Sequence, residues 1–169
     1  MRYWQDHLDE LWPERGTLHR DRVHVRAGDL LGIDLTFGPV TLSTGVVVTE
    51  SSPTRFTVLS PQGHAFAGWT KFEVADVEDG TRASITIEMR ASDPLFELGL
   101  MFGGHRSEER FWAEMLRNLA AQFGGRATVR LTRRRLGASR QWKHFSNVRH
   151  NATVLTTFRR ISRALGRAE

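Results

Sequence analysis

Cysteine is missing from this chain of 169 residues, so neither disulfide bonds nor thiolate chemistry can contribute to its structure or activity. That absence fits a reducing compartment. No segment approaches the roughly 20 consecutive apolar residues of a membrane-spanning helix. Residues 1–11 carry three acids and no apolar run, which is unlike a signal peptide. We therefore expect a soluble, cytoplasmic protein.

Sequence motifs of several enzyme and metal-binding classes are missing as well. There is no GxSxG motif of a serine hydrolase, no GxGxxG motif and no Walker loop. The seven histidines show neither HxH nor HExxH spacing, so we expect neither a metal ion nor any other cofactor. No catalytic residue can therefore be assigned from a motif.

Acidic residues are almost absent from the last quarter of the chain. Residues 126–169 contain 12 Lys and Arg against one acid, a net charge of +11. Residues 1–125 contain 12 against 18, a net charge of −6. A polyanion, an anionic membrane surface and the protein's own acidic body are all partners that fit such a segment.

The strongest pattern that is present is a strand followed by an amphipathic helix. In Thr81–Arg90, apolar and polar side chains alternate, which is typical of a strand with one buried face. Ser107–Phe123 places its apolar residues on one side of a helix, with Trp112 and Met115 among them. Because the helix stripe and the dry face of the sheet can bury each other, we predict that both side chains face the sheet.

Further strands and helices are predicted along the chain. Turn residues separate most of the strand candidates by short connections, which favour an antiparallel meander. The strands are expected at Leu18–Arg26, Leu30–Phe37, Val40–Thr49, Thr54–Ser60 and His64–Val77, and one more at Ala127–Leu136. Helices are expected at Tyr3–Trp12, at Leu95–Phe102 after the capping pair Asp93-Pro94, and at Val148–Leu165.

Three segments, Ser60–Trp69 (SPQGHAFAGW), Asp93–Gly99 (DPLFELG) and Phe111–Ala120 (FWAEMLRNLA), resemble the SRPBCC or START-like superfamily. This superfamily includes lipid-transfer domains, polyketide cyclases and pollen-allergen-like proteins. The resemblance covers residues 16–124 and implies an α+β, helix-grip fold, in which a curved antiparallel sheet wraps around a long helix and leaves a hydrophobic cavity. It implies a domain at residues 1–125, with residues 126–169 as a basic strand and helix extension. It carries over no catalytic residue.

Aromatic and methionine side chains on these elements would line such a cavity, because ligand pockets are mostly apolar with few polar groups. His64 would lie at the cavity mouth as an acid–base group or ligand donor. The candidate ligand-binding residues are His64, Phe66, Trp69, Phe72, Met89, Phe96, Met101, Trp112 and Met115. Two alternatives stay open, namely that the apolar residues fill a solid core and that the backbone holds His64 near its turn.

Three functions follow as hypotheses. The first is a binding module for a small hydrophobic ligand, either a lipid or an aromatic, polyketide-like compound. The second is a cyclase or dehydratase that uses the same pocket, with His64 or a nearby carboxylate as base. The third is an interaction protein whose basic tail binds an anionic membrane or a nucleic acid. For the tail itself, the apolar stripe predicts an ordered helix docked on the body or on a second subunit, as in a homodimer; the stripe comprises Val154, Phe158, Ile161 and Leu165.

Overall fold

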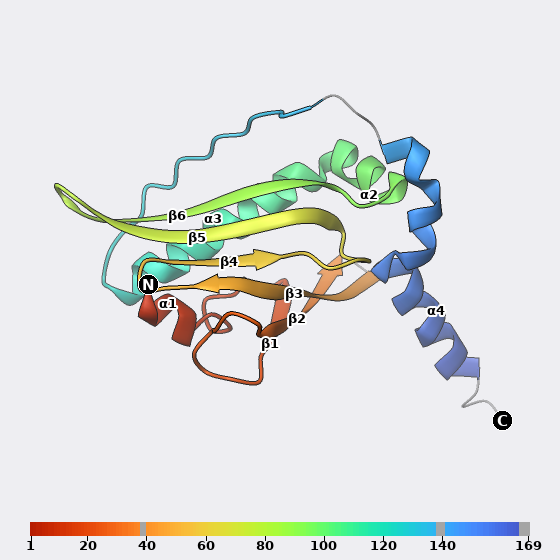
Figure 1. Ribbon diagram of the computed structural model, residues 1–169, viewed down its shortest axis with the longest axis horizontal. Helices are drawn as coiled ribbons and strands as arrows, with labels where there is room; N and C mark the ends of the chain where they lie inside the picture. The colour runs from red at the N-terminus through yellow and green to blue at the C-terminus, as the bar shows by residue number, and fades with distance from the viewer. Residues whose placement is uncertain (38–39, 138–140, 166–169) are drawn as a thin grey trace.

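A six-stranded antiparallel sheet forms the body of the protein in the computed structural model, which describes residues 1–37, 40–137 and 141–165. The strands lie in chain order across the sheet, so the predicted meander is confirmed. They are β1 (Gly16–His19), β2 (Leu30–Phe37), β3 (Val40–Ser51), β4 (Arg55–Leu59), β5 (Phe66–Val77) and β6 (Gly80–Ala91). The sheet is curved and several helices accompany it, which confirms the mixed α+β class (Figure 1).

The first helix is shorter than its sequence pattern indicates. Helix α1 spans Arg2–Asp6, so the predicted helix Tyr3–Trp12 is wrong in its second half. The guanidinium of Arg20 donates to the carbonyl oxygens of Gln5 and Asp6, at 3.1 and 2.6 Å. The Arg20 side chain thus supplies the hydrogen-bond donors that these last carbonyl oxygens of the helix lack. A further helical turn is not needed to pair them. Arg20 directly follows the end of β1 at His19, so the strand is shorter than the predicted Leu18–Arg26 at its C-terminal end.

The helices after β6 run together instead of being separated. Asp93 caps α2 (Pro94–Gly99) as predicted, and its carboxylate accepts the N–H groups of Leu95 and Phe96 at 2.8 and 3.1 Å. A π-helical turn, η1 (Leu100–Gly104), then leads directly into α3 (His105–Gln122). The gap between the predicted helices Leu95–Phe102 and Ser107–Phe123 is therefore wrong. A Cβ at residue 104 would lie 2.8 Å from the carbonyl oxygen of Gly99, so glycine permits the π turn here.

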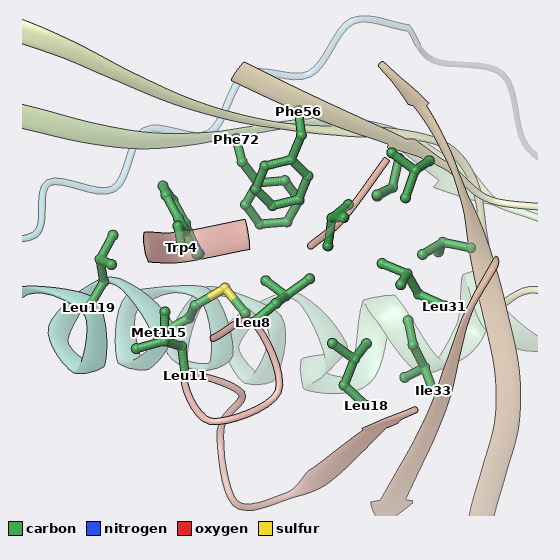
Figure 2. Close-up of a cluster of buried hydrophobic side chains, with 14 residues drawn as sticks. Trp4, Leu8, Leu11, Leu18, Leu31, Ile33, Phe56, Phe72, Met115 and Leu119 are labelled. Carbon is green, nitrogen blue, oxygen red and sulfur yellow. The ribbon is translucent and has the colours of Figure 1, made fainter. Parts of the chain in front are cut away.

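The hydrophobic core lies between the sheet and α3, and the N-terminal segment fills part of it (Figure 2). Trp4 and Leu8 are each 1% exposed and contact side chains from both layers. The rings of Phe56 and Phe72 stack at 4.2 Å, and Trp4 meets Phe72 edge-on at 5.4 Å. Met115 is fully buried, which confirms that this helix residue faces the sheet.

Residues 126–137, which we call the arginine strap, leave α3 and run beside the outer edge of β6 (Figure 1). The strand predicted at Ala127–Leu136 is wrong, because this segment makes no ladder with β6. A physical reason is like charge. The strap carries five arginines, and the neighbouring strand carries Arg82 and Arg90, so close pairing would bring cations together.

The C-terminal residues are docked on the body through polar groups. A 3-10 segment, η2 (Gln141–His150), precedes helix α4 (Ala152–Leu165), which lies against β3. Asn151 donates from its Nδ2 to the Asp93 carboxylate at 2.8 Å, and both residues are buried. The N–H of Ala152 donates to the carbonyl oxygen of Gly63 at 3.0 Å. We call the Asn151–Asp93 contact the latch.

The structure describes the side chains of two residues of the predicted apolar stripe of α4. Val154 is half-buried, and Phe158 is 67% exposed. The side chains of Ile161 and Leu165 lie outside the described residues. At the start of α4, the hydrogen bonds of Asn151 and Ala152 attach the helix to the body.

Candidate functional site

A cleft with a volume of about 2490 Å³ opens between β6 and α3. Strand β6 and helix α3 form two of its walls, η1 lines one end, and the arginine strap borders its outer side. Figure 1 shows the strap running beside β6, with α3 behind the sheet. The cleft is thus bounded by the domain and by the first part of the basic extension together.

The alternating pattern of β6 explains the apolar wall. Ile85, Ile87 and Met89 point to the core side of the sheet, and all three line the cleft. They are only half-buried, because β6 is the last strand of the sheet and the packed core thins toward it. Trp4 borders the cleft where that core ends. Apolar surface is therefore left uncovered beside α3.

The structure brings three of the nine predicted site residues to this cleft. Met89, Met101 and Trp112 line it. Phe72 and Met115 are instead buried in the solid core, which is the alternative that the sequence left open for them. Residues that lie outside the lining of the cleft altogether are His64, Phe66, Trp69 and Phe96.

For two of these residues, the reason why they do not line the cleft is local. Trp69 lies three positions before Phe72 on β5, so the two side chains point to opposite faces of the sheet. His64 is held by the backbone of Phe66, whose nitrogen and carbonyl oxygen both lie 3.1 Å from its Nδ1. Burial lowers the pKa of His64, although the interaction of its ring with the carbonyl oxygen of Phe66 opposes this. His64 is therefore a neutral imidazole in a turn and not a group at the cleft mouth.

Glu108 is the titratable group of the cleft that the sequence pattern missed. It lies in the first turn of α3, where an acidic side chain ordinarily interacts favourably with the helix dipole. In the folded protein it lines the cleft, and burial raises the pKa of its carboxyl to about 7. A long hydrogen bond from Trp112 Nε1, 3.5 Å, opposes the rise, and the adjacent Glu109 adds to it. A carboxyl poised near neutral pH can donate or accept a proton.

The raised pKa makes a prediction about stability. Because the unfolded carboxyl ionises near its ordinary value of 4.5, the folded state holds the extra proton between about pH 4.5 and 7. The contribution of Glu108 is thus greatest at acidic pH and is lost as pH rises through 7. Glu108→Gln should flatten this dependence and raise the free energy of unfolding at pH 8 by about 1–3 kcal/mol. Urea unfolding at pH 5 and 8 measures the difference.

A matched variant controls for general charge removal in that experiment. Glu114→Gln, on the same helix and outside the lining of the cleft, should leave the pH dependence unchanged. If both variants shift the curve equally, the effect belongs to the charge of the helix and not to burial in the cleft.

Comparisons with known proteins leave the family open. No family model matches the chain, and no curated protein matches it. Among solved structures, the chain is similar to the X-ray crystal structure of protein NE0264 from Nitrosomonas europaea, with 13% identity and a TM-score of 0.47. That similarity covers 72% of this chain and 80% of the other. In the described part of the chain, none of the helices has the length and apolar character needed to cross a membrane.

Proposed function

We propose that this protein is a helix-grip module that binds a small hydrophobic molecule, a lipid or an aromatic compound of polyketide type, in the cleft between β6 and α3. The observation that carries the proposal is the apolar surface within that cleft. Ile85, Ile87 and Met89 from the sheet line it together with Trp112 and Leu116 from α3. A cleft of about 2490 Å³ with these side chains in its walls offers an apolar occupant surface to cover.

The size of the cleft bears on the kind of ligand. Pockets for drug-sized molecules are typically about 300–1,000 Å³. The larger volume here suits an extended chain or a polycyclic compound, and the open outer side gives it a path of entry. Met89 and Met101 supply flexible thioether side chains that adapt to varied shapes.

A second function, an acid–base enzyme that uses the same cleft, is favoured by Glu108. A carboxyl whose pKa is raised to about 7 is suited to proton transfer at neutral pH, as cyclase or dehydratase chemistry requires. In this version Glu108 replaces His64 as the acid–base group. Glu108→Gln would then abolish turnover while leaving ligand binding in place, whereas in a carrier it would change neither appreciably.

Filling the cleft from β6 should weaken the binding of an apolar fluorescent probe. We expect the folded protein to bind such a probe with a defined stoichiometry. Met89→Trp, which adds an indole inside the cleft, should lower the affinity about tenfold, equivalent to about 1.4 kcal/mol. Fluorescence titration measures both quantities.

The control for this experiment is Leu59→Trp. Leu59 lies on β4, is 43% exposed and is not part of the lining of the cleft, so an added indole there should not reach it. Probe binding that occurs only under partly denaturing conditions would contradict the proposal, because the cleft would then be closed in the native protein.

A further inference from the structure

We propose that the arginine strap recognises an acidic head group, so that the occupant of the cleft is an anionic amphiphile with its apolar part against β6 and α3. This inference rests on the proposed binding function and names the chemical class of its ligand. It assigns a role to residues 126–137, which follow the domain in sequence and line one side of its cleft.

The charge of the cleft is unequally distributed. The strap contributes Arg126, Arg130, Arg133, Arg134 and Arg135, and it contains no acidic residue. The domain side combines the apolar side chains of β6 and α3 with charged side chains of both signs, among them Arg82, Glu88, Arg90, Glu97 and Arg106. The charged groups of the strap are therefore all cationic, whereas the domain walls offer apolar surface among charges of both signs. An occupant with one anionic end and one apolar end matches that division.

One arginine of the strap is anchored to α3. Arg133 Nη1 lies 3.4 Å from the carboxylate of Glu109, and the side chains are 63% and 35% exposed. This ion pair places the strap close to Glu108, the residue that precedes Glu109 in α3. It also neutralises one of the two carboxylates at this point of the cleft. The electrostatic repulsion between α3 and an incoming anion is therefore weaker than it would be if both carboxylates were unpaired.

The other arginines are not committed to the protein's own carboxylates. Arg135 donates to the carbonyl oxygen of Gly137 at 2.9 Å. Within the described chain, Arg126, Arg130 and Arg134 form no ion pair and no hydrogen bond through their side chains. Exposed ion pairs stabilise proteins by only about 0–1 kcal/mol, so stability gives little reason for five arginines here. Guanidinium groups bind carboxylate and phosphate oxygens through two parallel hydrogen bonds.

The shared placement of strap and apolar wall favours an amphiphile over a nucleic acid. A nucleic acid on the arginines would leave the apolar surface of Ile87 and Met89 unoccupied. An amphiphile uses both, since its tail covers that surface while its carboxylate or phosphate meets the guanidinium groups. Residues from the domain and from the extension would then contribute to one site.

The experiment is calorimetric titration of the full chain with three C12 amphiphiles, each kept below its aggregation concentration. They are dodecanoate, dodecyl phosphate and dodecanol. We expect at least one of the two anions to bind roughly tenfold tighter than the alcohol, as a charge-assisted hydrogen bond allows. The stronger of the two anions identifies the head group. Arg126→Gln/Arg130→Gln/Arg134→Gln should remove that preference and leave dodecanol binding unchanged.

A matched triple variant, Arg22→Gln/Arg117→Gln/Arg159→Gln, removes the same charge at exposed sites outside the cleft and should keep the preference. Equal binding of all three amphiphiles would overturn the role of the strap while the hydrophobic binding function stands. A preference lost equally in both triple variants would overturn it too. Failure of all three to bind would overturn the binding function itself. Binding to anionic vesicles, with no binding of the monomeric amphiphiles, would assign the arginines to a membrane surface instead.

Discussion

Replacing Met115 with alanine is expected to lower the free energy of unfolding by about 2–5 kcal/mol. The side chain is fully buried in the core cluster, where it meets the aromatic residues of the sheet and the N-terminal segment. Its loss removes apolar contacts and leaves a cavity between two layers that are held apart by other large side chains. Urea-induced unfolding followed by tryptophan fluorescence measures the change.

Met101→Ala is the matched control, because it makes the same substitution at a methionine that lines the cleft and is 55% exposed. It should cost well under half as much, since less apolar surface leaves the protein interior. Equal losses for the two variants would mean that α3 is not packed on the sheet at Met115, and the arrangement of layers would be wrong at its centre.

Much of the sheet was predictable from the sequence because its signals are local. Alternation in residues 81–90 depends on which side chains share a face, and turn residues mark where each strand ends. β2 coincides with its predicted range, and β3 to β6 lie within two residues of theirs. Elements whose ends depend on distant groups were less predictable. The truncation of α1 depends on Arg20, which is remote in sequence and adjacent only in the folded chain.

The candidate site was less predictable for the same reason. Trp69 and Phe72 are three residues apart on β5, an odd spacing that places them on opposite faces of a strand. The predicted set of site residues included both, although they cannot line the same cavity. Glu108 carries a standard signal for the first turn of a helix, and only the fold reveals that its carboxyl is buried. The strap was predicted to be a strand from its composition. A strand forms only where a neighbouring strand can hydrogen-bond to it, and the sequence does not indicate whether β6 does so.

The latch between the extension and the domain should respond strongly to a single change of charge. Asn151→Asp places a second carboxylate against the Asp93 oxygen that now accepts a hydrogen bond at 2.8 Å, and both positions are buried. We expect the free energy of unfolding at pH 8 to fall by about 3–5 kcal/mol, as for other uncompensated buried charges. Amides in the first turns of α4 should also exchange faster with solvent, because the attachment of the helix to Asp93 is lost.

Adding Asp93→Asn to that variant should recover most of the loss, since the donor and the acceptor then merely change sides. Both helix caps keep an oxygen for the backbone N–H groups that they serve. Asn147→Asp controls for added charge, because Asn147 donates to the carbonyl oxygen of Ser92 from an exposed position, so this change should cost about 1 kcal/mol or less. A double variant no better than Asn151→Asp alone would show that the apolar side of α4, and not the latch, holds the extension in place. Recovery would instead show that the latch is the contact that holds the start of α4 on the domain.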